Sequence, residues 1–190
     1  MPRQYLYTRD QILAAALDLT RRKGISALTA RALGQQLGTS AKPIFGQFES
    51  MEQVQLGVRQ EAQRLYEQRL TQAMQEGKYP PYKASGMAYI RFALEERELF
   101  RLIFMRDRSG EGNPDDRESV GEILKLLQEK LGLNEEQAAL FHGEMWLFVH
   151  GIATALATGY LSWDEERISR MMTDVYMGLK SRFCETVQNP

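Results

Sequence analysis

Residues 29–48, TARALGQQLGTSAKPIFGQF, contain the pattern that decides the fold of this 190-residue chain. Leu33 and Leu37 lie four residues apart, as do Ile44 and Phe48. Residues at this spacing share one face of an α-helix, so each pair marks the inward face of a short helix. The stretch therefore predicts two short helices in close succession.

A tight turn is predicted between these two helices. Gly38 follows the first pair, where a left-handed residue can end a helix at low steric cost. Thr39 or Ser40 can then cap the second helix with a side-chain oxygen. Counted from a Ser40 cap, Pro43 is the third helical residue, where a missing N–H loses no bond inside the helix. This spacing is typical of a helix-turn-helix, whose second helix enters the major groove of DNA.

The charge of this region indicates a polyanionic partner. Residues 19–48 contain no Asp or Glu, and their basic residues are Arg21, Arg22, Lys23, Arg31 and Lys42. Residues 1–50 hold seven Lys or Arg against three Asp or Glu, while the rest of the chain holds 17 against 22. A basic N-terminal part on an acidic body places the polyanion site in that part.

Lys42 is the most informative of these cations. In the first turn of a helix a cation opposes the helix dipole, at a cost of about 0.3–1 kcal/mol. A contact with a phosphate or a guanine edge explains such a residue better than stability does. A three-helix packing unit with a cationic surface is the alternative interpretation.

The positions left over once Ile44 and Phe48 face inward predict a set of DNA contacts. We expect phosphate contacts from Thr29, which caps the first helix, from Arg31 and from the arm formed by residues 1–7. We expect base contacts from Lys42, Gln47 and Ser40. The full predicted DNA-binding set is Thr29, Arg31, Thr39, Ser40, Lys42, Phe45 and Gln47.

Composition sets broader bounds. The chain is 43% hydrophobic and 26% charged, which is typical of a soluble globular protein with a real core. Its single cysteine excludes an intramolecular disulfide framework. No export segment is recognisable at the N-terminus, and we expect a cytoplasmic protein.

Helical periodicity runs through the whole chain, and no stretch has the alternation of a strand. We expect helices over about 8–23, 29–37, 40–48, 50–74, 82–95, 99–105, 118–131, 134–161 and 164–187, with a charged loop at 106–117. The sequence therefore predicts an all-α protein. It divides into a helix-turn-helix DNA-binding domain at 1–50 and a helical effector-binding and dimerisation domain at 51–190, connected by a long helix from Ser50.

The helix expected from Asn134 to Leu161 is apolar on nearly every side between Met145 and Tyr160. That run is too short and too polar at its start for a membrane span. It must therefore be covered by the core on one side and by a partner subunit on another. The sequence predicts a homodimer whose interface contains Gly151, Ala155, Gly159, Val175 and Leu179.

The second domain holds more aromatic and flexible apolar side chains than a small bundle needs. We expect an effector pocket for a mainly hydrophobic small molecule with one or two polar atoms. The predicted lining is Tyr89, Phe92, Phe100, Phe104, Met105, Trp146 and His150. A fully packed core with a satisfied histidine is the alternative.

Catalytic chemistry is not expected. His142 and His150 lie eight residues apart, about 12 Å along a helix axis, which is too far to share a metal directly. The chain has no glycine-rich phosphate loop, cysteine cluster or nucleophile elbow. We expect no enzyme activity, no cofactor and no metal.

Several short runs also carry a family resemblance. They are Ile12-Leu13-Ala14-Ala15-Ala16, Gly24, Leu28-Thr29, Leu33, Leu37-Gly38, Ile44-Phe45-x-x-Phe48 and Ser50-x-Glu52. Over residues 8–56 they resemble the N-terminal domain of the tetracycline-repressor (TetR) family. The resemblance implies an all-helical homodimeric transcriptional regulator, usually a repressor, that a small molecule releases from its operator. The run from Trp146 to Gly151 resembles the ligand-binding domain of one TetR subgroup.

Three positions depart from the family pattern. Phe45 stands where the family usually has a tyrosine, so a phosphate-binding hydroxyl is absent. Lys42 replaces a small residue, and Met51 replaces the lysine that commonly opens the next helix. These departures bear on the individual DNA contacts rather than on the class of protein. An all-helical carrier or protein-interaction module without sequence-specific DNA binding is the competing interpretation.

Overall fold

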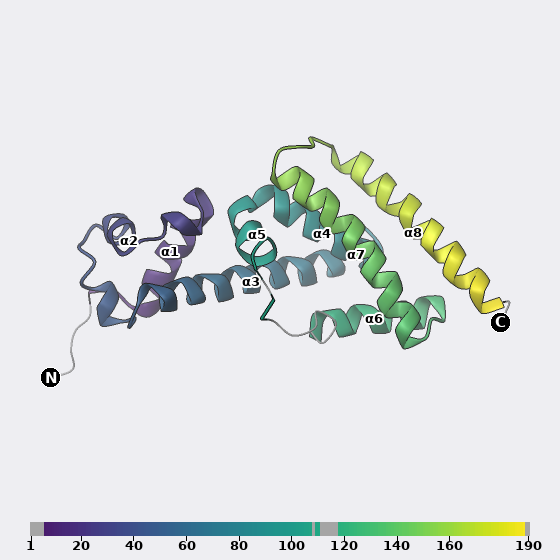
Figure 1. Cartoon of the computed structure of the whole chain (residues 1–190), viewed down its shortest axis with the longest axis horizontal. Coiled ribbons are helices and arrows are strands. Elements are labelled where there is room, and N and C mark those ends of the chain that lie inside the picture. Colours follow the sequence, from purple (N-terminus) through teal and green to yellow (C-terminus); the bar gives the residue numbers. More distant parts are fainter. Residues whose placement is uncertain (1–5, 108, 111–117, 189–190) are drawn as a thin grey trace. The chain divides into compact units, whose positions relative to one another are not determined.

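The computed structural model describes residues 6–107, 109–110 and 118–188, and says nothing of the side chains of residues 118, 119 and 184–188. The arm residues 1–5 and most of the expected loop at 106–117 lie outside the described residues. Figure 1 traces the helices in chain order. They are α1 (Arg9–Lys23), α2 (Ala30–Gln36), α3 (Met51–Gln75), α4 (Pro81–Glu95), α5 (Arg97–Phe104), α6 (Glu118–Leu131), α7 (Glu135–Ala157) and α8 (Glu165–Gln188), with short 3₁₀ helices η1 (Ile25–Ala27) and η2 (Ile44–Gly46).

The fold class predicted from the sequence is confirmed. The protein is all-α, and no strand occurs in the part of the chain that is described. Among the described residues, no helix combines the length and apolar character needed to cross a membrane.

The helices form two compact units. Unit 1 contains residues 1–68 and 95–106, and unit 2 contains residues 69–94 and 107–190. The long helix α3 contributes to both, and α5 belongs to unit 1 although it follows α4 in the chain. The expected functional division at residue 50 remains a prediction.

In unit 1, α1 packs against α2, η1 and α5. A capping box opens this helix, because the Thr8 side chain accepts from the Gln11 amide and the Gln11 side chain from the Thr8 amide. Gly24 ends the helix with φ of +79°. Buried apolar residues from α1, α2 and α3, such as Ile12, Leu33 and Val54, form the core.

In unit 2, α7 packs against α6 and runs beside α8 (Figure 1). A cluster of aromatic rings fastens α4 to these helices. Phe141 on α7 lies 5.6 Å from Tyr176 and 5.5 Å from Phe183, both on α8, measured between ring centroids. Tyr82 on α4 lies 6.2 Å from Phe141. A capping box formed by Asn134 and Gln137 opens α7.

One predicted helix end is wrong. α7 ends at Ala157 rather than near Leu161. Gly159 follows with φ of +76°, a left-handed conformation that stops a helix. Gly159, predicted at the dimer interface with Gly151 and Ala155, therefore lies outside the helix that carries those two residues.

Candidate functional site

The end of α2 forms the predicted turn. The Thr39 amide donates to the Gly34 carbonyl at 2.9 Å and the Gly38 amide to the Gln35 carbonyl at 3.1 Å, the two bonds of a Schellman motif. Gly38 has φ of +70°. A Cβ added at Gly34 would lie 3.0 Å from the Thr39 carbonyl oxygen, so this position also favours glycine. Sequence reasoning identified Gly38 but missed Gly34, whose requirement comes from the folded-back turn.

The second helix of the predicted pair is not an α-helix. It is the single 3₁₀ turn η2, with Pro43 at its N-terminal boundary and no side-chain cap. The predicted cap at Thr39 or Ser40 is therefore wrong, and Pro43 is not a third helical residue. A proline shortly before so brief a run removes one backbone donor, and four-residue spacing alone does not distinguish the two helix types.

The inward face of this element is as predicted. Ile44 is fully buried and Phe48 nearly so. Ser40 and Lys42 are exposed, and so is Phe45, with 48% of its surface accessible. Thr39 and Gln47 are half-buried. The element therefore presents Ser40, Lys42 and Phe45 outward from a buried apolar anchor.

The start of α2 carries the other predicted contacts. The Thr29 hydroxyl oxygen accepts from the Ala32 amide at 3.2 Å, which confirms the predicted N-cap. Thr29 and Arg31 are both exposed.

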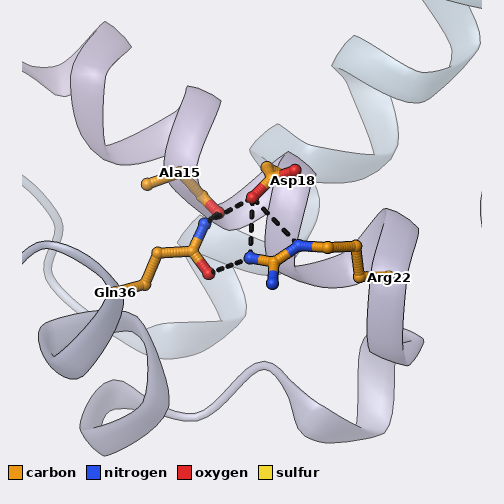
Figure 2. Close-up of polar contacts among 4 residues, drawn as sticks. All are labelled: Ala15, Asp18, Arg22 and Gln36. Carbon is orange, nitrogen blue, oxygen red and sulfur yellow. Dashed lines mark hydrogen bonds and ion pairs between the residues drawn. The ribbon is translucent and has the colours of Figure 1, made fainter.

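Figure 2 shows the polar contacts that hold α2 against α1. The Gln36 amide nitrogen donates to the Ala15 carbonyl at 2.9 Å and to Asp18 at 2.8 Å, while its oxygen accepts from Arg22 at 2.7 Å. Arg22 also donates to Asp18 at 2.7 Å. These bonds, that from Arg22 above all, hold the pKa of the Asp18 carboxyl below its ordinary value.

Two of the five cations in residues 19–48 are neutralised by acids outside that stretch. Arg22 pairs with Asp18, one helical turn earlier. Arg21 pairs at 2.6 Å with Glu96, a buried acid just before α5. Within the described residues Lys23, Arg31 and Lys42 have no ion-pair partner. The basic surface is therefore smaller than the residue count predicts, and it includes both Arg31 and Lys42.

Unit 2 brings together three of the residues predicted to bind an effector. The Tyr89 hydroxyl on α4 lies 2.8 Å from Nδ1 of His150 on α7. The Trp146 and His150 rings stack with centroids 4.9 Å apart and planes 10° from parallel. Nε2 of His150 lies 3.5 Å from the Thr154 hydroxyl. Trp146 keeps 37% of its surface exposed, so part of this aromatic pair is accessible.

The remaining predicted effector residues are distributed over both units. Phe92 is buried in α4 of unit 2. Phe100 and Phe104 lie in α5 of unit 1, their rings 5.2 Å apart, and Met105 follows with 40% exposure. Tyr89, Trp146 and His150 form one cluster in unit 2, and Phe100 and Phe104 form a ring pair in unit 1.

The residues predicted to form a dimer interface lie on α7, α8 and the turn after α7. Gly151 is exposed, and a Cβ added there would meet nothing within 4 Å. Ala155, Val175 and Leu179 are half-buried. Further exposed apolar residues, which the sequence analysis did not select, are Leu140 at 55%, Leu147 at 64% and Met177 at 55%.

The fold and the turn define the class: an all-helical protein with an N-terminal helix-turn-helix. Residues 12–56 match the family model described as "Bacterial regulatory proteins, tetR family". Residues 82–176 match the model described as "Tetracyclin repressor-like, C-terminal domain". Together the matches cover more than half of the chain, which therefore belongs to the TetR family and is a DNA-binding transcriptional regulator. A comparison with curated proteins gives no match.

Proposed function

We propose that the protein is a ligand-responsive repressor. It binds a near-palindromic DNA operator as a homodimer and leaves it when a small, mainly hydrophobic molecule binds unit 2. The observation that carries the DNA-binding part is the outward face of the helix-turn-helix. Lys42 and Arg31 are exposed there and have no ion-pair partner among the described residues, so both are available to an anionic partner.

The individual contacts follow from exposure. Arg31 and the Thr29 hydroxyl hold phosphates, while Lys42 and Ser40 reach base edges. Phe45, which has no hydroxyl, contributes apolar contact, for example with a thymine methyl group. Thr39 and Gln47 are half-buried and contact DNA at the margin of the interface.

The proposed dimer buries the outer face of α7 together with α8. Leu140, Leu147 and Met177 are more than half exposed, and an apolar surface of this kind favours burial against a second copy. A Cβ added at Gly151 would meet no atom within 4 Å. A partner helix can therefore approach α7 closely at this position. A two-fold dimer would present two helix-turn-helix elements to half-sites about 34–36 Å apart, one turn of DNA.

The proposed effector contacts the Trp146–His150 pair. The indole supplies an accessible aromatic face, and the Tyr89–His150 pair supplies polar atoms beside it. Few polar groups among apolar ones are typical of sites for small hydrophobic molecules. Such a ligand binds more tightly to a conformation that does not bind DNA, and so lowers the affinity for DNA. The loss of DNA affinity cannot exceed the ratio of the ligand's affinities for the two conformations.

Selection of bound duplexes from a random pool, followed by titration at several salt concentrations, tests the DNA-binding part. We expect affinity to fall steeply with salt on every duplex, and a preference for the selected sequences to persist at moderate salt. Binding without any sequence preference would contradict the operator. No binding at low salt would favour the carrier or protein-interaction interpretation.

A further inference from the structure

The segment between α2 and α3 has little regular structure of its own. Its backbone bonds near η2 are short-range: the Ile44 amide donates to the Ala41 carbonyl at 3.1 Å and the Gly46 amide to the Pro43 carbonyl at 3.2 Å. Short 3₁₀ turns have poorer hydrogen-bond geometry than α-helices. We call residues 38–48 the recognition segment. Its inner side is anchored by Ile44 and Phe48, but its orientation about that anchor needs further contacts.

Residues 7–9, just before and at the start of α1, supply those contacts. The Tyr7 hydroxyl donates to the carbonyl of Leu37, the residue before the recognition segment. The Tyr7 carbonyl accepts from the Gln47 side-chain nitrogen at 3.0 Å. Tyr7 therefore bridges the two ends of the segment, through its side chain at one end and its backbone at the other.

Arg9 reinforces the same end. Its guanidinium donates to the Gln47 carbonyl at 3.3 Å and lies 4.2 Å from the centroid of the Phe48 ring. Arg9 lies in the first turn of α1, whose cap at Thr8 fixes the backbone direction of residues 7–9. The contacts made by Tyr7 and Arg9 therefore connect the recognition segment to the start of α1.

We propose that Tyr7 is a positioning residue for DNA recognition: it holds the recognition segment in the orientation in which Lys42 and its neighbours face DNA. The proposal rests on the proposed DNA contacts. Side chains that read bases must be held in place by their surroundings. When only a fraction of molecules has the competent orientation, the apparent affinity is the intrinsic affinity multiplied by that fraction. Loss of the Tyr7 hydroxyl should lower this fraction without removing any contact with DNA.

The bridge also constrains Gln47. One N–H of its side-chain amide is donated to the Tyr7 carbonyl, so the oxygen and the second N–H remain for a base. A carbonyl oxygen accepts hydrogen bonds and so suits the exocyclic amino group of adenine or cytosine.

The test compares Tyr7→Phe with Tyr79→Phe in the full-length protein. Tyr79 is the matched control, because its hydroxyl also donates one hydrogen bond, to Glu165 at 2.9 Å, but in unit 2. Affinity is measured well below the unfolding temperature, on a duplex selected by the wild type and on a scrambled duplex of the same composition. We expect Tyr7→Phe to weaken binding to the selected duplex roughly three- to tenfold. Binding to the scrambled duplex and the salt dependence should be unchanged, as should all values for Tyr79→Phe.

A second measurement needs no DNA. Amide hydrogen exchange in the recognition segment should be faster in Tyr7→Phe, by the same roughly three- to tenfold factor, while exchange in α1 stays as in the wild type. Equal losses on both duplexes with a smaller salt dependence would overturn the proposal, because Tyr7 would then contact phosphate directly. Unchanged exchange would also overturn it. A wild type without sequence preference would refute the proposed operator, whereas exchange would still decide whether Tyr7 holds the segment.

Discussion

The indole of Trp146 lies parallel to the imidazole of His150, with ring centroids 4.9 Å apart and 10° between the planes. Trp146 as a whole keeps 37% of its surface exposed. Nδ1 of His150 lies 2.8 Å from the Tyr89 hydroxyl, which ties α7 to α4. A ligand that stacks on Trp146 would therefore contact a ring of α7 that packs on His150, and His150 is hydrogen-bonded to Tyr89 of α4.

We expect Trp146→Ala to weaken effector binding while DNA binding by the free protein stays within about twofold. Loss of an aromatic stacking face should lower affinity by about tenfold or more. Because the indole is partly exposed, we expect a stability loss of about 1–2 kcal/mol, below that of a core tryptophan. A thermal-shift screen of small aromatic compounds on the wild type supplies the ligand, and calorimetry measures its affinity for each variant.

Trp163→Ala is the matched control for this experiment. Trp163 also packs against a side chain, the Arg167 guanidinium at 4.6 Å from its ring centroid, but outside the Trp146–His150 pair. Equal effects of the two substitutions on ligand affinity would contradict a site at Trp146. A Trp146→Ala protein that unfolds would identify the residue as core.

The Asp18 carboxylate should make the free energy of unfolding depend on pH. Its pKa is lowered in the folded protein, chiefly by the hydrogen bond from Arg22, from an ordinary value of 3.8. A lowered folded pKa stabilises the fold above about pH 4, and this contribution disappears as the pH falls through the folded pKa. We therefore expect Asp18→Asn to be less stable than the wild type at pH 7 and to lose less stability on acidification to pH 3.

Urea unfolding at pH 7 and at pH 3 measures this difference. The control is Asp174→Asn, which removes an exposed acid from α8. Identical pH dependence of the wild type and Asp18→Asn would show that the contacts in Figure 2 do not depend on the charge of Asp18.

Gly151→Leu should weaken the proposed dimer. A Cβ at this position meets nothing within 4 Å in one protomer, so the substitution should leave the protomer fold intact. Overpacking an interface typically costs about 1–3 kcal/mol, so we expect the dimer dissociation constant to rise by about tenfold or more. Sedimentation of the purified protein over a range of micromolar concentrations measures it.

Gly121→Leu controls for the added side chain, because Gly121 is also open but lies on α6. A dimer of unchanged strength in Gly151→Leu would place this residue outside the interface. A wild type that sediments as a monomer at micromolar concentration would contradict the dimer itself.

Local signals in the sequence predicted much of the fold. Thr8 with Gln11 and Asn134 with Gln137 mark helix starts, because each side chain satisfies an amide only three residues away. The burial of Ile44 and Phe48 followed from their spacing alone. These features depend on neighbours along the chain, which a sequence displays directly.

Features that depend on distant parts of the chain were not predicted. Glu96 neutralises Arg21 across 75 residues, and α5 belongs to unit 1, yet neither fact has a local signature. The second helix of the pair was mistaken for an α-helix because spacing fixes which side chains face inward but not how tightly the backbone winds. The contact from Gln47 to Tyr7 was missed because it joins residues 40 positions apart.

Lys42→Ala should weaken binding to the selected duplex more than binding to a scrambled one. The side chain is exposed, and within the described residues no acid neutralises it. If it reads a base, its loss should cost about 1–3 kcal/mol on the selected duplex and relax preference at one position. If it holds only a phosphate, both duplexes should lose affinity equally and the salt slope should fall by about one.

Fluorescence anisotropy across salt concentrations distinguishes a base contact from a phosphate contact. Lys23→Ala, which removes an exposed cation from α1, is the control. Unchanged affinity and unchanged preference in Lys42→Ala would place Lys42 outside the interface.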